Sequence, residues 1–358
     1  MATNTRKRLW LALRLLVSVG LLAWLVWQYN WYLTWQALLH ASVWGITALI
    51  GGILINRLIA FYRFWVLLRS EGADIGLQVA ARLGFLSAFV TNFLPSTVGG
   101  DVVKIGWLGS QGYAIWRATL WTLFDRLSNM TAVGLMIPFC LAIPAVATQV
   151  DDRLGWKVSP GMIFYLSLGL GAVCAVILGS GWLHLKKPVE TDAPRLDDEP
   201  LTAETPQDVD VNEQAEAMIK GGVLYRLQAV WMKVLGRRGI FGLLVIISLL
   251  SILPNLIGTW ILARDLDIPV TLIEVTAVYV VQYFVTLLPI SLNGLGLLEV
   301  GTAVLYQDLG ATQAQALAMA VLLRFAIWLT SLPGAIWLGR GVKTEALRLP
   351  GKRVNGNA

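Results

Sequence analysis

Long apolar segments recur along the chain and set the pattern of the whole sequence. Six of them have the length of roughly 20 residues that a helix needs to cross a hydrocarbon core about 30 Å thick. They cover residues 9–27, 43–64, 118–142, 162–182, 239–262 and 316–338. The sequence therefore predicts an all-α polytopic membrane protein with about six full transmembrane helices.

Two further apolar segments, residues 79–108 and 276–309, are interrupted midway by proline and glycine. The breaks contain Pro95, Gly99 and Gly100 in the first segment, and Pro289, Gly294 and Gly296 in the second. Irregular backbone at membrane depth is tolerated where it is buried in protein or lines a cavity. We expect two re-entrant helical hairpins. The alternative is a pair of tilted, kinked full spans.

The two interrupted segments also resemble one another in sequence. Phe-Val-Thr occurs at 89–91 and again at 284–286, and Leu-Pro follows shortly after each. An acidic residue comes after each break, and an arginine lies 25 residues beyond it: Asp101 with Arg126, and Glu299 with Arg324. Because an odd number of full crossings separates the halves, this repeat is expected to be inverted, as in secondary transporters. We expect the functional site where the two hairpins meet.

Arg126 and Arg324 are the candidates with the most specific chemistry. An ionisable side chain within a span is costly, so it usually faces the bundle interior and has a partner. A guanidinium can bind an anionic phosphate through two parallel hydrogen bonds. It can also form a structural salt bridge with the acid of its own half, Asp101 or Glu299, and the sequence leaves both readings open. Asp125 points to another helix face than Arg126 and is expected to pair elsewhere.

The two breaks themselves supply weaker candidates. Glycines at the first break precede a predicted helix start, where free backbone N–H groups favour an anion, and Lys104 adds a positive charge there. The segment Asn293-Gly294-Leu295-Gly296 at the second break is a weak candidate of the same kind. The candidate substrate-binding residues are Arg126, Arg324, Asp101, Glu299, Lys104, Asn92 and Asn293. The candidate hinge residues are Pro95, Gly99, Gly100, Pro289, Gly294 and Gly296.

Composition agrees with a membrane protein and argues against several chemistries. Charged residues make up 14% of the chain, against roughly a quarter in soluble domains. Cys140 and Cys174 fall inside predicted spans, and His40 and His184 lie in unrelated contexts. We therefore predict no disulfide, no metal site and no cofactor. The sequence contains no nucleotide-binding loop and no nucleophile elbow, so a transporter is expected rather than an enzyme.

The net charge of +6 is unevenly distributed. Residues 186–222 are rich in Asp, Glu and Pro and are predicted to form an acidic disordered loop. The remainder is basic, which suits an anionic lipid surface and does not require nucleic acid. Lysine and arginine gather on one side of the predicted spans, which places both termini and the acidic loop in the cytoplasm. The loop separates a first membrane half at 1–185 from a second at 223–340, and a basic cytoplasmic tail follows at 341–358.

Short motifs around the breaks resemble a known family. They are Arg63-Phe-Trp-Val-Leu-Leu, Asn92-Phe-Leu-Pro95, Gly99-Gly100-Asp101-Val-Val-Lys104 and Asp125-Arg126-Leu127, then Leu288-Pro289-Ile290, Gly294-Leu295-Gly296, Glu299 and Arg324. These motifs resemble those of the lysylphosphatidylglycerol synthase transmembrane (flippase-like) family. The resemblance covers most of the chain outside residues 186–220. That resemblance implies a membrane module tied to moving a modified phospholipid between leaflets. In relatives a separate soluble domain attaches the amino acid, and we expect neither that domain nor aminoacyl transfer here. Lys104 stands where many relatives carry Arg, and this difference leaves the identity of the lipid open.

Two classes of function remain after this reading. The first is a lipid translocase for an anionic phospholipid or a polyprenyl-phosphate-linked lipid in a bacterial inner membrane. The second is a membrane-embedded transferase or an accessory subunit of a lipid-modifying or cell-envelope glycan pathway, for which Asp101 is the best candidate base. The expected partners are an anionic lipid headgroup, membrane lipids and, as a candidate protein partner, a lipid-modifying enzyme. No nucleic acid is expected.

Overall fold

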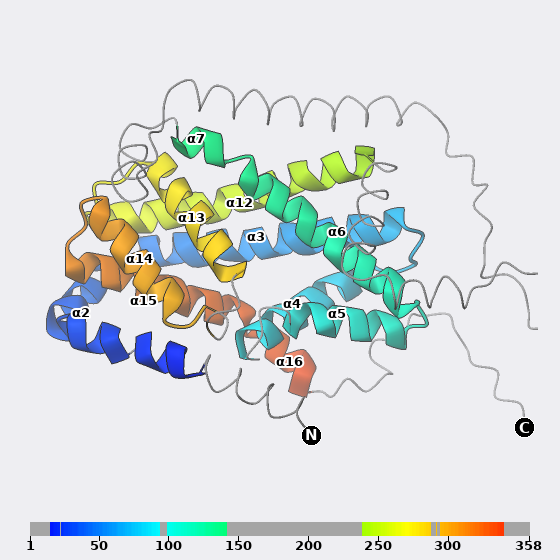
Figure 1. Ribbon diagram of the computed structural model, residues 1–358, viewed down its shortest axis with the longest axis horizontal. Coiled ribbons are helices and arrows are strands. Elements are labelled where there is room, and N and C mark those ends of the chain that lie inside the picture. Colours follow the sequence, from blue (N-terminus) through cyan, green and yellow to red (C-terminus); the bar gives the residue numbers. More distant parts are fainter. Residues whose placement is uncertain are drawn as a thin grey trace, which may run out of the picture. The chain divides into compact units, whose positions relative to one another are not determined.

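A computed structural model describes residues 15–21, 23–93, 99–141, 238–287, 291 and 294–339 (Figure 1). Every regular element within these ranges is an α-helix, which confirms the all-α prediction for this part of the chain. The helices are α2 (Trp31–His40), α3 (Val43–Ser70), α4 (Leu77–Phe93), α5 (Gly99–Ser110), α6 (Ile115–Gly134), α7 (Ile137–Leu141), α12 (Arg238–Asp265), α13 (Leu272–Leu287), α14 (Leu297–Asp308), α15 (Gln313–Ser331) and α16 (Pro333–Gly339). A shorter apolar helix, Leu15–Gln28, precedes them.

The described residues include three stretches long and apolar enough to cross a membrane. They are Val43–Ser70, Gly239–Asp265 and Gln313–Trp337. These candidate spans coincide with the spans predicted at 43–64, 239–262 and 316–338. The span predicted at 162–182, the acidic loop at 186–222 and the tail at 341–358 lie outside the described residues, so the expected total of six spans stays a prediction.

The span predicted at 118–142 is interrupted in the structure. Its first part is α6, which ends at Gly134, and α7 begins only at Ile137. Pro138 stands in the first turn of α7 and has no N–H to continue the hydrogen-bond ladder of α6, which favours a break just before it. A matching break separates α15 from α16, where Pro333 begins the second helix.

Each interrupted apolar segment forms a pair of packed short helices. In the first half α4 packs against α5, and a Cβ on Gly100 would collide with Ser87 and Thr91 of α4. In the second half α13 packs against α14. The helices have 17 and 12 residues in the first pair and 16 and 12 in the second. Each is shorter than the roughly 20 residues of a full span. The turns with Pro95 and Pro289 lie outside the described residues.

Helix lengths divide the structure into two matching series. The first series, α3 to α6, has helices of 28, 17, 12 and 20 residues. The second, α12 to α15, has helices of 28, 16, 12 and 19 residues. The same order and nearly the same lengths therefore occur twice along the chain.

Individual hydrogen bonds recur at equivalent places in the two series. The indole N–H of Trp65 donates to the carbonyl of Ile75 at 2.9 Å. In the second series Trp260 donates in the same way to Val270 at 3.1 Å. Both tryptophans and both carbonyls are related by a shift of 195 positions.

The turn that follows the long helix is also repeated. Gly72 and Asp267 stand at equivalent positions and have positive φ angles of 80° and 58°. The next residue in each turn donates its N–H back to the last turn of the helix, from Ala73 to Leu68 and from Ile268 to Ala263. A left-handed residue closing a helix in this way is a common C-terminal cap. Matching caps show that the repetition extends to backbone conformation.

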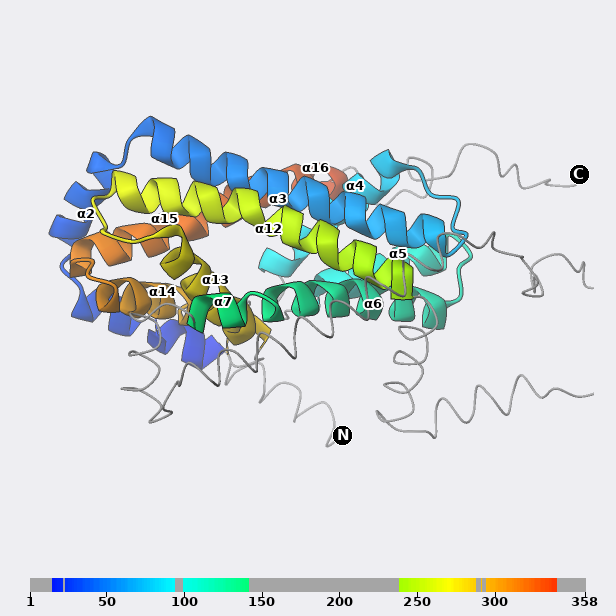
Figure 2. The same cartoon turned by 90° about the horizontal axis from the view of Figure 1, so that it is seen from above.

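The two long helices lie side by side (Figures 1 and 2). Glycines bring their backbones together, because a Cβ on Gly52 of α3 would strike the carbonyl of Pro254 in α12. Gly258 of α12 meets the carbonyl of Ala48 in the same way. Small residues commonly permit this close approach between membrane helices.

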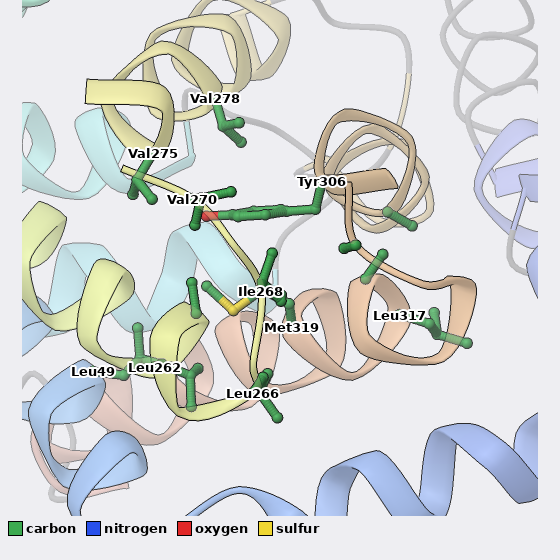
Figure 3. Close-up of a cluster of buried hydrophobic side chains, with 14 of the residues drawn as sticks. Leu49, Leu262, Leu266, Ile268, Val270, Val275, Val278, Tyr306, Leu317 and Met319 are labelled. Carbon is green, nitrogen blue, oxygen red and sulfur yellow. The ribbon is translucent and has the colours of Figure 1, made fainter. Parts of the chain in front are cut away.

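A hydrophobic cluster fills the space between α3, the end of α12, α14 and α15 (Figure 3). Its fully buried members include Leu49, Leu262, Tyr306 and Leu317. Many other large apolar side chains are exposed, and the tryptophans among them include Trp27, Trp35 and Trp44. Outward apolar surface with tryptophan near helix ends fits a protein surrounded by lipid.

Candidate functional site

The first predicted pair is present in the structure. Asp101 lies in the first turn of α5, where a carboxylate is favoured by the helix dipole. Its Oδ2 atom is 2.7 Å from Nη2 of Arg126 on α6. The side chains of Asp101 and Arg126 are 19% and 35% exposed. This ion pair is therefore partly accessible.

A second cluster of charges lies beside this pair and was not predicted. Arg63 of α3 is 5% exposed and donates through Nε to Asp125 at 2.8 Å. Its Nη1 atom donates to Asn129 at 2.9 Å and to Ser248 of α12 at 2.6 Å. Lys104 approaches the other oxygen of Asp125 at 3.9 Å. Asp125 thus pairs away from Arg126, as expected.

The second predicted pair is more deeply enclosed. Glu299 lies in the first turn of α14, and Arg324 of α15 donates to both carboxylate oxygens, through Nη2 to Oε2 at 3.0 Å and through Nε to Oε1. Both side chains are only 9% exposed. Nη2 also donates to the carbonyl of Gly294, and Oε2 of Glu299 accepts from the N–H of Gly296 at 2.9 Å. Side chain and turn therefore hold each other in place.

Positive φ angles at Gly294 and Gly296 make that turn possible. Their values of 73° and 79° lie in the left-handed region that glycine adopts without strain. A Cβ on Gly296 would also collide with Ser18 and Leu21 of the first apolar helix. The requirement for glycine here is conformational and steric at once.

A cavity of about 360 Å³ opens beside the second pair. It lies among α3, α12, α13, α14 and α15, and its volume is within the range of about 300–1,000 Å³ usual for ligand pockets. Arg57, Glu299 and Arg324 are its charged lining residues among those described, and the carboxamides of Asn56, Asn255 and Gln282 also face it. The remaining lining is largely apolar. A cavity of this kind can hold a small polar group among membrane helices.

Arg57 is the most notable residue that sequence reasoning missed. It stands midway along α3 and donates through Nε to the Thr330 hydroxyl at 3.1 Å and through Nη2 to the Ile327 carbonyl at 3.0 Å. Both acceptors belong to α15 and are neutral. The sequence offered a signal, because the apolar stretch continues past Arg57 to Leu68 and places this charge inside the helix. The span predicted at 43–64 contained both Arg57 and Arg63, and the structure places both in the candidate span Val43–Ser70.

Polar contacts connect the first charge cluster with the cavity. Asn129, which accepts from Arg63, donates to the hydroxyl of Tyr283 on α13 at 3.0 Å. The ring of Tyr283 lies 6.4 Å from that of Tyr279, which lines the cavity. The two halves are thus joined by a chain of polar and aromatic side chains through α13.

The other predicted residues fall into two groups. Gly99 and Gly100 are buried at the start of α5, and Asn92 lies near the end of α4. Asn293, Pro95 and Pro289 lie outside the described residues. The structure brings Asp101 to Arg126, Glu299 to Arg324 and Lys104 to Asp125. The substrate-binding roles of these residues stay predictions.

No group of three His, Cys, Asp or Glu side chains is placed for a metal ion within the described ranges. Cys140 is a buried free thiol in α7. The acids of the two sites are instead paired with arginine or lysine. Their arrangement can organise a polar site and balance charge within apolar surroundings.

The fold and the site define an integral membrane protein with a polar cavity among its helices. The family model described as Lysylphosphatidylglycerol synthase TM region matches residues 11–334. The chain belongs to this family, and the resemblance found in its motifs is confirmed. Membership links the protein to lipid modification. No curated protein matches the sequence.

Proposed function

We propose that the protein is a lipid translocase that moves an anionic lipid headgroup between leaflets through the polar cavity. The observation that carries the proposal is the cavity, which contains charged and carboxamide side chains among apolar helices of membrane-spanning length. Ionisable groups within membrane-spanning helices are energetically unfavourable and commonly mark substrate pathways. The family's connection with lipids supports a lipid as the substrate.

The repeated helix series supports alternating exposure of that cavity. In this proposal α4 with α5, and α13 with α14, are re-entrant hairpins that open to opposite sides of the membrane, and the two series form an inverted repeat. Rocking of one repeat against the other is the usual way such architectures expose a central site to either side. The polar chain through Asn129, Tyr283 and Tyr279 would couple the movement of the two halves.

Only the headgroup needs to enter the protein. Its tails remain in lipid, so the protein must replace the hydration of a small charged group, and a few charge-assisted hydrogen bonds are sufficient for that. Arg126 is the more accessible of the two predicted arginines and suits a transient contact with the headgroup. Glu299 and Arg324 keep the cavity wall in place during passage.

The geometry around Asp101 favours translocation over a transferase reaction. A general base needs a carboxylate that is not already engaged, whereas Asp101 is held in an ion pair with Arg126 at 2.7 Å. In the described residues, Glu299 and Asp125 are engaged with cations in the same way. A transferase would require one of these pairs to open first.

Reconstitution of the full chain into vesicles tests the proposal. Acyl-labelled phosphatidylglycerol should move between leaflets faster than in protein-free vesicles, as measured by chemical quenching of the outer-leaflet label. Arg126→Ala, and the double change Glu299→Gln with Arg324→Gln, should slow this movement. Arg69→Gln is the matched control, since Arg69 lies on the exposed end of α3 with its side chain 52% exposed.

The opposite result is equally specific. If no phospholipid and no polyprenyl phosphate moves faster with the wild-type protein, while the same protein transfers a sugar or an amino acid onto lipid, the transferase function replaces this one.

A further inference from the structure

We infer that Arg57 is the residue that binds the anion in the cavity, and that the cavity selects a headgroup with a single negative charge, a phosphodiester. This inference rests on the proposed function and names its substrate class. It departs from the sequence analysis, which named Arg126 and Arg324 as candidate anion ligands and did not name Arg57. The argument depends on which charges facing the cavity are already balanced.

Arg324 is not available as the main anion ligand. Its Nε and Nη2 atoms donate to the two oxygens of Glu299, and Nη2 donates also to the carbonyl of Gly294. A bidentate pair with a carboxylate is among the strongest side-chain interactions. Glu299 and Arg324 together therefore present no net charge to the cavity.

Arg57 has a different set of partners. Its Nε and Nη2 atoms donate to the neutral oxygens of Thr330 and Ile327. Among the described residues no carboxylate forms an ion pair with it. These two contacts fix the guanidinium against α15 and leave its charge unbalanced. An unbalanced cation in apolar surroundings is unfavourable, and a bound anion would relieve it.

The charge of the cavity then limits the charge of the ligand. Of its described lining residues, Arg57 and Arg324 are positive and Glu299 is negative, which leaves one net positive charge. A phosphodiester carries one negative charge and balances it. A diphosphate would bring surplus negative charge into the same space, and a cationic headgroup would be repelled by Arg57.

The neutral lining fits the rest of such a headgroup. Asn56, Asn255 and Gln282 provide carboxamides for phosphate oxygens or hydroxyl substituents, and Gln282 is oriented by a 2.7 Å bond to Thr302. Tyr306 also belongs to the lining, and its hydroxyl is buried and has no hydrogen-bond partner among the described residues. A buried hydroxyl without a partner is unfavourable, and a ligand in the cavity is one group that would satisfy it. Donors therefore surround the site on several sides.

Two lipid classes carry this chemistry, glycerophospholipids and polyprenyl-phosphate sugars, and binding experiments can distinguish them. Purified full-length protein would be titrated with short-chain phosphatidylglycerol, short-chain phosphatidylcholine, a short polyprenyl-phosphate sugar and its diphosphate counterpart, and tryptophan fluorescence would be followed. We expect one of the two monoanionic phosphodiesters to bind most tightly. Preference for phosphatidylglycerol identifies a glycerophospholipid, and preference for the phosphate sugar identifies a polyprenyl lipid.

Variants of the cavity test the role of Arg57. Arg57→Gln should weaken binding of the preferred monoanion about tenfold, as expected for loss of one charge-assisted hydrogen bond. Binding of phosphatidylcholine should change much less, and Arg57→Lys should retain part of the affinity. Arg69→Gln on the same helix is the control and should bind like the wild type.

A second variant protects the test against misfolding of Arg57→Gln. Asn255→Asp adds a negative charge to the cavity wall and leaves every arginine in place. It should also weaken binding of the monoanion. The inference is overturned if folded Arg57→Gln protein or Asn255→Asp protein binds the monoanion as tightly as the wild type, or if the diphosphate binds best. These readouts measure binding, so a protein that binds the monoanion but moves no lipid refutes the proposed function and leaves this inference standing.

Discussion

The carboxylate–arginine pairs of the two halves stand at equivalent positions, 198 residues apart, but their surroundings differ. Asp101 and Arg126 are partly exposed and lie beside a second cluster formed by Arg63, Asp125 and Lys104. Glu299 and Arg324 are nearly buried and are bonded to the backbone of the turn before α14. The same chemical pair is thus an accessible contact in one half and a structural support in the other.

The difference extends to the long helices. Arg63 anchors the charge cluster in α3, and its counterpart in α12 is Gly258, which allows close packing against α3. The cavity is lined mainly by helices of the second series. Glu299 and Arg324 form part of its wall, and Arg57 of α3 also lines it. A repeat with unequal halves can therefore provide one binding site together with a separate charged cluster that is connected to it.

Removing the acid from each pair gives the largest expected contrast. Glu299→Ala leaves Arg324 buried without its partner and should destabilise the protein by about 3–5 kcal/mol. Asp101→Ala should reduce stability by about 1 kcal/mol or less, because that pair is partly exposed. The thermal unfolding midpoints of both variants in the same detergent measure the contrast. Equal losses would show that the two pairs have equivalent structural roles.

Adjacent glycines in α3 offer a test of the helix contact. Gly52→Ala should destabilise the protein by about 1–3 kcal/mol, because the added methyl group meets the backbone of α12. Gly51→Ala is its control, since a Cβ at Gly51 has nothing within 4 Å. The control should be neutral or stabilising by up to about 1 kcal/mol, the usual gain of alanine over glycine in a helix. Similar unfolding midpoints for the two variants would contradict the close approach.

The repeated turns after the long helices predict the smallest effects. Gly72→Ala forces a side chain into the left-handed region and should destabilise by about 1 kcal/mol. Asp267→Gly at the equivalent turn removes such a side chain and should leave stability unchanged or raise it slightly. Unfolding midpoints of the two variants should therefore move in different directions or by clearly different amounts. A loss in both would mean that Asp267 contributes contacts that outweigh its backbone conformation.

The sequence was sufficient to predict the pairs but not which helices line the cavity. Equal spacing of an acid and an arginine after two similar breaks identified Asp101, Arg126, Glu299 and Arg324 without any knowledge of helix packing. Arg57 was missed because no acidic residue stands at the repeated spacing from it, although the apolar residues beyond it place it inside the helix. The cavity depends on how α3 and four later helices pack, and no local pattern encodes that arrangement.

The turns that contain Pro95 and Pro289 and the orientation of the termini remain predictions. A cysteine introduced at position 200 or 353 should not react with an impermeant reagent added outside intact cells, because both positions are predicted to be cytoplasmic. Efficient labelling of either position would reverse the assigned orientation and, with it, the side to which each hairpin opens.

Movement of labelled lipid through a deliberately filled cavity tests the central claim most directly. Ala60 lines the cavity on α3, and Ala60→Phe would occupy space there without removing any charged residue. In vesicles, wild-type protein should accelerate exchange of acyl-labelled phosphatidylglycerol between leaflets, and folded Ala60→Phe protein should return the rate to that of protein-free vesicles. Exchange by Ala60→Phe at the wild-type rate would contradict the account, because the headgroup would then cross the membrane by another route.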